Sequence, residues 1–208
     1  APVVSNRGTV GAPVVVAAGA PANIDLTANI SGVVASNPAA VYALAASQPL
    51  VGGSGTTSVA GNVVTFTPGG GFTGPTTFTF TKEGPGGTSN IATVFIEVAA
   101  APVVSPTSVT TAFNTAIPVN LAAFIASSQP VTSVTPSAPI NGTALATGPT
   151  TITFTPTPGY FGPASFAYTA TSLGGTSAVA ATVTVTVNPP PPTVSPTTVT
   201  VPFNGGSP

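Results

Sequence analysis

The sequence predicts an all-β protein in which antiparallel β-sandwiches follow one another along the chain. Three observations support this fold class. The 208 residues are 42% hydrophobic and rich in Val, Ile, Phe and Thr, which favour strands. Apolar residues alternate with Thr in short runs, which is typical of strands with one buried face. Several motifs recur after 88 residues, which indicates a repeated domain.

Repeated motifs divide the chain into two copies of one unit and the beginning of a third. Val-Thr-Phe-Thr-Pro at residues 64–68 returns as Ile-Thr-Phe-Thr-Pro at residues 152–156. The opening Ala-Pro-Val-Val-Ser returns at residues 101–105, and a related Pro-Thr-Val-Ser-Pro begins at Pro192. We therefore expect repeat 1 at residues 1–100, repeat 2 at 101–188, and a proline linker with the first strand of a third repeat at 189–208.

The strands of both repeats can be placed from the alternation. The closing run at 182–187 alternates Thr and Val strictly, so its Val side chains should face the core. Turn signals such as Asn-Gly at 141–142 separate the runs. Segments 39–47 and 121–128 are each expected to form a helical turn. The expected core residues are Val64, Phe66, Phe78, Phe80, Val94, Ile96 and Val98 in repeat 1, and Ile117, Val119, Leu121, Ile152, Phe154, Phe166 and Tyr168 in repeat 2.

The seams between the repeats are short and stiff. They are Ala-Ala-Ala-Pro at 99–102 and four consecutive prolines at 189–192. A proline run favours the extended polyproline II conformation and acts as a semi-rigid spacer. We therefore expect the sandwiches to form an elongated array.

Residues 139–188 carry motifs that resemble a known family. These are Pro-Ile-Asn-Gly-Thr-Ala at 139–144, the Gly-Tyr-Phe-Gly corner at 159–162 and the closing Val-Thr strand. They resemble the bacterial Ig-like and cadherin-like tandem repeats of long extracellular surface proteins. The resemblance covers residues 101–188 well and 1–100 more loosely. It implies Greek-key Ig-like sandwiches located outside a bacterial cell or at its surface.

The sequence departs from these relatives at the positions that bind calcium. Many relatives carry Asp after the glycine corner and after the strand that follows it, where this chain has Thr76, Ala164, Gly84 and Ser172. Calcium takes about six to eight oxygen ligands, several of them from carboxylates. Because the whole chain has three carboxylates, we expect no repeating calcium site, no other metal and no cofactor.

The composition also argues against catalysis. Only five side chains are charged, and His and Cys are absent. General acid–base chemistry needs a group that titrates near the working pH, and Asp25, Glu83 and Glu97 are expected to be separate, solvated charges. Two basic residues cannot neutralise a nucleic-acid backbone, and no apolar run approaches the roughly 20 residues of a membrane helix. The sequence predicts a non-enzymatic protein without nucleic-acid binding or membrane insertion.

Two features of the sequence have a chemical and a structural interpretation. Lys82 beside Glu83 is expected to form an exposed charge pair. The alternative is a Lys-to-Asn cross-link, which would need a buried acid. The corner aromatics Phe72, Tyr160 and Phe161 are expected to plug the ends of the sandwiches rather than to form a platform for a sugar.

Several exposed positions are candidate contact or modification sites. Phe95 alternates with inward-facing neighbours, so it should point outward as part of a contact surface. The strand near the C-terminus either begins the third repeat, which we favour, or pairs with a neighbouring subunit. The longer loops of repeat 1, at 5–26 and 52–62, are the expected place for a ligand. The candidate interface residues are Phe95, Thr197, Val199, Val201 and Phe203, and the candidate N-glycosylation sites are Asn29 and Asn141.

The scarcity of charge predicts self-association. Exposed strand edges are normally guarded by charged residues, and a surface without charge loses little solvation on contact. We expect a structural repeat unit of a bacterial filament, sheath or surface stalk that assembles through its sandwich surfaces, with itself as its partner. Glycans covering the surface are the rival explanation for the missing charge. The alternative function is an adhesin segment that binds a host or carbohydrate ligand through loops at the sandwich ends.

Overall fold

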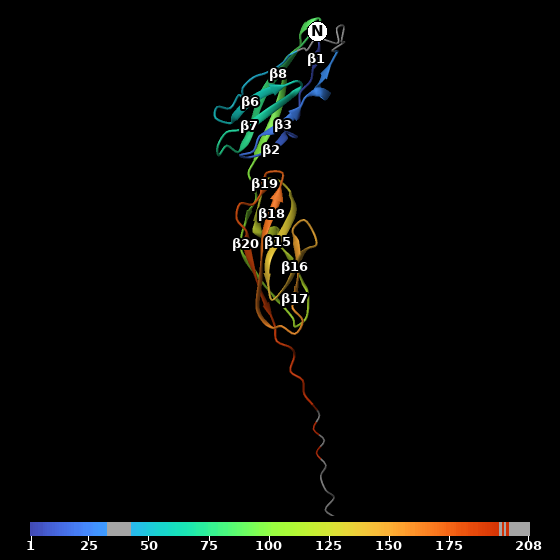
Figure 1. The fold of residues 1–208 in the computed structure, drawn as a ribbon, viewed down its shortest axis with the longest axis vertical. Helices are drawn as coiled ribbons and strands as arrows, with labels where there is room; N and C mark the ends of the chain where they lie inside the picture. The colour runs from blue at the N-terminus through green and yellow to red at the C-terminus, as the bar shows by residue number, and fades with distance from the viewer. Residues whose placement is uncertain (33–42, 196, 198, 200–208) are drawn as a thin grey trace, which may run out of the picture.

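The computed structural model describes residues 1–32, 43–195, 197 and 199 of the chain. Figure 1 shows two β-rich units arranged end to end along the long axis, followed by an extended segment that begins near residue 188. All regular structure in the described residues is strand, apart from two single turns of 3₁₀ helix.

Repeat 1 is a sandwich of two sheets. The smaller sheet has the order β3-β7-β6. Strands β1 and β4 form a separate short pair. The larger sheet has the order β2-β10-β8-β5, with β9 paired to β8. The strands are β1 (Val3–Val4), β2 (Val14–Ala17), β3 (Ala22–Asp25), β4 (Ile30–Ser31), β5 (Leu44–Ala46), β6 (Gly55–Ala60), β7 (Val63–Pro68), β8 (Gly74–Gly84), β9 (Gly87–Thr88) and β10 (Ala92–Ala99).

Repeat 2 has the same topology. Its larger sheet is β12-β20-β18-β15 with β19 on β18, its smaller sheet is β13-β17-β16, and β11 pairs with β14. The chain crosses repeatedly from one sheet to the other, as Greek-key connections require. The strands are β11 (Val103–Val104), β12 (Thr107–Thr111), β13 (Ile117–Asn120), β14 (Ile125–Ala126), β15 (Val131–Ile140), β16 (Gly142–Ala146), β17 (Thr151–Pro156), β18 (Gly162–Ser172), β19 (Gly175–Thr176) and β20 (Ala181–Val187).

The predicted fold class, tandem Ig-like sandwiches, is therefore confirmed. The pairing is antiparallel throughout the named strands except at one position in each repeat. There, β2 runs parallel to β10 over four residue pairs, Ile96 to Ala99. In repeat 2, β12 runs parallel to β20 over five residue pairs, Thr107 to Thr111. An early strand of each repeat is thus bonded to its last strand.

Each repeat has its own hydrophobic core. Alternation is complete in β20, where Ala181, Val183, Val185 and Val187 are buried and the intervening Thr side chains are exposed. All the expected core residues are buried except Ile117, which is half-buried and packs against the core of repeat 2. A fully buried Val or Phe side chain contributes roughly 1.5–3 kcal/mol, so these two clusters dominate the stability of the two units.

The expected helical turns are partly wrong. Within 121–128, the 3₁₀ turn is limited to Ala122–Phe124 and is followed by β14. Residues 39–42 lie outside the described residues, and the later part of that segment is strand β5. Leu44 is buried and opposes Lys82 of β8, so burial of this side chain in the core favours the strand over a turn.

The chain entering each repeat packs against a hairpin of that repeat. A Cβ atom added to Gly174, in the β18–β19 hairpin, would lie 2.0 Å from the backbone oxygen of Ala100. In repeat 1, a Cβ added to Gly86 of the corresponding hairpin would lie 2.5 Å from the backbone nitrogen of Ala1. Such distances leave no room for a side chain, so glycine is required where the hairpin meets the incoming chain.

Candidate functional site

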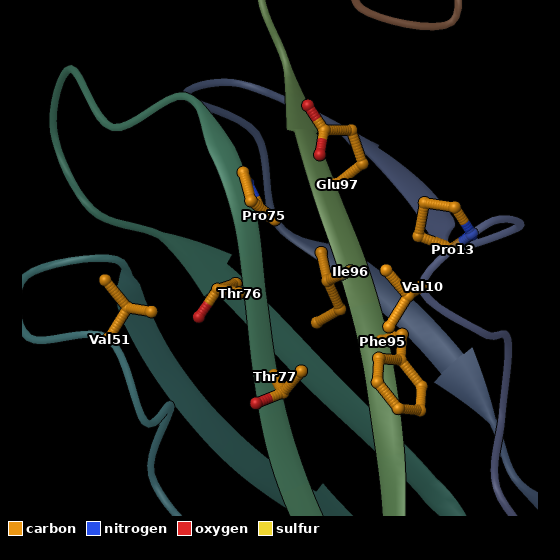
Figure 2. A pocket seen from close by; sticks show the side chains of 9 residues that line it. All are labelled: Val10, Pro13, Val51, Pro75, Thr76, Thr77, Phe95, Ile96 and Glu97. Carbon is orange, nitrogen blue, oxygen red and sulfur yellow. The ribbon is translucent and has the colours of Figure 1, made fainter.

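A groove on the outer face of the larger sheet of repeat 1 is the main candidate site. It has a volume of about 220 Å³ and lies over β8 and β10. Figure 2 shows Val10 and Pro13 on one side of the strands that carry Phe95 and Thr77, and Val51 on the other side. The lining is mainly apolar, and Glu97 places one carboxylate at its end.

Alternation along β10 places Phe95 in this groove. Val94 and Ile96 are buried in the core, so the Phe95 ring points to the opposite face, where it is half-buried. Phe95 opposes Thr77 of β8. The predicted outward orientation of Phe95 is therefore confirmed, and the ring lies in a groove rather than on an open face.

The first wall of the groove comes from the longer N-terminal segment of repeat 1. Arg7 is bonded to β10 on both sides, because its N–H donates to Thr93 O at 3.0 Å and its carbonyl accepts from Phe95 N–H at 3.0 Å. A tight turn follows, in which Thr9 and Ala12 form a two-residue bridge. This turn brings Val10 to the groove beside Phe95.

The second wall is a loop held by buried hydroxyl groups. The Ser54 hydroxyl donates to Val51 O at 2.6 Å and shares a second hydrogen bond of 2.9 Å with the Thr76 hydroxyl. Ser54 and Thr76 are both buried. Val51 is thereby held beside β8.

The groove is built for a small apolar contact. Pockets for whole small-molecule ligands occupy about 300–1,000 Å³, and the groove is smaller than this. It suits one or two apolar side chains, or a small apolar face of a sugar against the Phe95 ring. Glu97 supplies a hydrogen-bond acceptor at this end of the groove.

Repeat 2 has different residues at two of the positions that line this groove. Val94 lies opposite Phe78 in repeat 1, and Val183 lies opposite Phe166 in repeat 2, so the two valines are equivalent. The residue after each valine is Phe95 in repeat 1 and Thr184 in repeat 2. By the same register Thr186 replaces Glu97. The two repeats therefore share a fold but not this surface. Sequence reasoning found Phe95 and the longer loop of repeat 1, but it did not identify Val10, Pro13 and Val51 as wall residues.

The corner aromatics are mostly structural. Phe72 and Tyr160 are half-buried and pack against the cores of their repeats, as expected. The Tyr160 hydroxyl donates to Pro163 O and accepts from Asn141 Nδ2 at 2.8 Å. Phe161 differs from the expectation, since 56% of its surface is exposed. Tyr160 fills the space at the corner, which leaves its neighbour Phe161 to point outward.

The expected exposed pair of Lys82 and Glu83 is wrong. Lys82 is buried, and its Nζ donates to Asn62 Oδ1 at 2.8 Å. Glu83 is exposed on the other face of β8. The same contact bears on the cross-link alternative, because an asparagine does stand beside the lysine. The three carboxylates of the chain are on Asp25, Glu83 and Glu97, and the first two are exposed while the third lies at the groove. The buried acid that the cross-link needs is therefore missing.

The remaining acid, Asp25, is a solvated charge with a local role. Its Oδ1 accepts from the backbone N–H of Thr27 at 2.8 Å, at the start of the 3₁₀ turn. Hydrogen bonds from Thr27 lower the pKa of Asp25 below its ordinary value. Within the described residues, no group of three or more acidic, His or Cys side chains could hold a metal ion.

Both candidate glycosylation sites are engaged in hydrogen bonds. Asn29 Nδ2 donates to Asn6 O at 2.8 Å. Asn141 Nδ2 donates to the Tyr160 hydroxyl and, at 3.0 Å, to Pro163 O. A glycan on either nitrogen would replace one of its hydrogens, so it would compete with these bonds. Glycosylation at the two positions stays a prediction.

The C-terminal candidate residues are only partly described. Thr197 and Val199 are exposed and belong to no strand, and 77% of the Val199 surface is accessible. Val201 and Phe203 lie outside the described residues. The two interpretations of this segment, a third repeat or a strand for a neighbour, both stay predictions. In the described parts of the chain, no helix is long and apolar enough to span a bilayer.

The described geometry defines a protein of two tandem Ig-like sandwiches, each with a Greek-key core and with surface differences confined to loops and outward positions. The family model for the bacterial Ig domain matches residues 1–97 and again residues 99–188. The chain therefore belongs to the bacterial Ig domain family, as its motifs indicated. No curated protein sequence is significantly similar to it.

The solved structures that match this chain are distant from it in sequence. An endo-fucoidan hydrolase of glycoside hydrolase family 107 is 17% identical with a TM-score of 0.45, and the match covers 89% of this chain and 34% of the hydrolase. The fibronectin(III)-like modules of Clostridium thermocellum CbhA are 15% identical with a TM-score of 0.37, covering 84% and 89%. A Drosophila N-cadherin fragment is 15% identical with a TM-score of 0.34, covering 90% and 67%. This chain spans about a third of the length of the hydrolase.

Proposed function

We propose that this chain is a structural repeat unit of a bacterial extracellular filament, sheath or surface stalk, and that it acts without catalysis. The observation that carries the proposal is the distribution of charge. All five charged side chains lie between Arg7 and Glu97, so residues 98–208 contain none. A complete Ig-like sandwich is thus built without a single ionisable acidic or basic side chain.

Such a surface favours contact between copies of the chain. Net charge normally keeps soluble domains apart, and here the repulsion between two copies of repeat 2 is absent. Backbone groups and Thr or Ser hydroxyls are desolvated at lower cost than charged groups. The end-to-end arrangement of the repeats in Figure 1 also suits an elongated rod. The partner in this proposal is another copy of the chain.

The proposal can be tested with the unglycosylated 208-residue chain. We expect multi-angle light scattering to give an apparent mass that rises with protein concentration, and to do so almost equally at low and high salt, since few charges are involved. A monodisperse monomer at the highest attainable concentration would count against assembly. Cryo-electron microscopy of the native material should then show repeats aligned along a polymer axis.

The groove of repeat 1 favours a second candidate function, an adhesin segment. It contains an aromatic ring and a carboxylate on one face of β10, and threonines stand at both positions in repeat 2. Adhesion would require Phe95, so Phe95→Ser should abolish binding to the target cell or glycan. Thr184→Ser is the matched control in repeat 2 and should leave binding unchanged. Equal binding by both variants would exclude this groove as the ligand site.

A further inference from the structure

The edge strand β6 of repeat 1 is closed by a glutamine. Gln48 Nε2 donates to Thr57 O at 3.3 Å, and its Oε1 accepts from Thr57 N–H at 3.1 Å. Thr57 lies in the middle of β6 opposite Phe66 of β7. Since its two backbone groups are bonded to Gln48, they point away from β7 to the free side of the sheet. The amide side chain therefore occupies the place that an added strand would take.

The corresponding edge of repeat 2 has no such closure. Ala144 of β16 opposes Phe154 of β17 as Thr57 opposes Phe66, so the backbone N–H and C=O of Ala144 point to the free side as well. In repeat 2, Ser137 of β15 lies opposite Ala167 of β18. In repeat 1, the backbone N–H of Ser47 donates to Thr79 O at the equivalent place. Ser137 therefore corresponds to Ser47, and the next residue, Ala138, corresponds to Gln48. Alanine has no amide group. Among the described residues, no side chain bonds to the backbone of Ala144.

Two other edge strands of repeat 2, β15 and β13, are protected in ways that β16 is not. Strand β15 contains Pro136 and Pro139, and its register shifts between Ser137 and Ile140. Strand β13 contains Pro118. Proline and irregular register both prevent the addition of a further strand. Strand β16 has regular register over all five residues, no proline and no charge, and 69% of the Leu145 side chain is exposed.

The absence of charge indicates what would cover this edge. A charged partner would find no complementary group on repeat 2, because residues 98–208 carry no charge. A second copy of the same uncharged edge meets no like-charge repulsion. Antiparallel pairing of two β16 strands around Ala144 would let the two Ala144 residues exchange both backbone hydrogen bonds. Leu145 of one copy would then lie opposite Thr143 of the other.

We propose that two copies of this chain associate by antiparallel pairing of their β16 strands, with the β6 edge of repeat 1 excluded by Gln48. The inference rests on the proposed assembly and names its contact. A pair of five-residue strands forms a small interface, which is typical of weak complexes. Many such contacts along a rod of repeats would act together through effective concentration.

Sedimentation velocity on the full 208-residue chain tests the contact. Leu145→Lys places a charge beside the edge, where two copies would face each other, and should weaken association by about tenfold or more. Ser58→Lys is the matched control, since Ser58 holds the same place on β6 as Leu145 on β16 and is also exposed. We expect the control to associate like the wild type.

Hydrogen exchange provides a second readout that needs no substitution. Amide exchange at residues 142–146 should slow as the protein concentration rises, while exchange at residues 55–60 should stay constant. If the wild type does not associate at all, the proposed assembly fails together with this contact. If the wild type associates but Leu145→Lys and Ser58→Lys behave alike, and exchange at 142–146 does not change, assembly stands and the β16 contact is refuted.

Discussion

The side chain of Asn90 offers a direct measure of what one amide contributes to a charge-poor sandwich. Its Nδ2 donates to Val4 O at 2.9 Å, and its Oδ1 accepts from Val4 N–H at 3.0 Å. These two bonds tie the first strand of repeat 1 to the start of β10. Val4 is buried, so Asn90→Ala would leave two backbone groups without a protein partner.

The expected cost follows from these contacts. An intramolecular hydrogen bond contributes about 1 kcal/mol net, and an unsatisfied buried group costs about 1–3 kcal/mol. We expect Asn90→Ala to destabilise repeat 1 by about 2 kcal/mol. For a domain of this size, such a loss lowers the melting temperature by roughly 8–16 °C. Because the chain has no tryptophan, urea unfolding should be followed by far-UV circular dichroism or amide exchange. Either would measure this loss of stability.

Repeat 2 supplies the reciprocal experiment. The hydroxyl oxygens of Ser89 and Ser177 accept from the equivalent backbone N–H groups of Lys82 and Ala170. This places Ala178 where repeat 1 has Asn90. Val104 and Ala178 line a hollow of about 220 Å³ there. Ala178→Asn should therefore stabilise repeat 2 by about 1 kcal/mol. The reasoning is refuted if Asn90→Ala changes stability by less than about 0.5 kcal/mol, the usual range for surface substitutions.

Single contacts carry the remaining predictions. Tyr168→Phe should destabilise repeat 2 by about 1–2 kcal/mol in urea unfolding, because the hydroxyl donates to Ser105 O at 2.8 Å and lies 3.2 Å from Phe124 O; an unchanged midpoint would contradict this role. Burial raises the pKa of Tyr168 above 10.0, so the unfolded tyrosine ionises first and stability should fall above about pH 10, a loss that Tyr168→Phe should reduce in alkaline melting curves. The pKa shift of Asp25 has the opposite sign, because hydrogen bonds from Thr27 lower its pKa. The stability that Asp25 contributes is therefore present above its unfolded pKa of 3.8 and is lost as the pH falls through its folded pKa. Asp25→Asn should flatten the fall in stability at acid pH. Gly174→Ala should displace the incoming chain at Ala100, which small-angle scattering would detect as a changed maximum dimension with both repeats still folded; an identical scattering curve would show that the hairpin does not set the joint. Finally, the intact mass should equal the sum of the residue masses plus one water, without loss of ammonia between Lys82 and Asn62, since no carboxylate is buried beside them.

Much of the fold could be predicted because it depends on period-two alternation and on repetition. In β20 the Val and Thr residues alternate without exception, and burial follows them residue by residue. The same rule placed Val64 and Phe66 in the core of repeat 1 and Phe95 outside it. These predictions needed only local sequence, because each strand has one face toward the core.

The error at Lys82 shows where two local rules conflict. Phe78, Phe80 and Lys82 alternate along β8, which predicts an inward lysine. The opposite charge of the neighbouring Glu83 favoured instead an exposed pair. The conflict is resolved by Asn62, which lies 20 residues away in the sequence and accepts from the amine. Nothing in the local sequence identifies that partner.

The groove and the closed edge depend on contacts between distant segments. The extra length before β2 indicated that repeat 1 differs from repeat 2, but the bonds from Arg7 to β10 decide where Val10 lies. Likewise, Gln48 closes β6 through bonds to Thr57 that depend on the path of the loop after β5. Such contacts are set by tertiary register, and a single sequence does not contain that register in a local form.

The parallel pairing of an early strand with the last strand has a mechanical consequence. A pull on the two ends of repeat 2 would act on β12 and β20 in opposite directions along the same axis, because parallel strands have their entry and exit at opposite ends. The bonds between them would bear the load together, as in shear, and would not open one at a time like a zipper. Repeat 1 has four such residue pairs in β2 and a fifth where Arg7 pairs with Val94, and repeat 2 has five in β12, so the two sandwiches should resist the same tension to a similar degree.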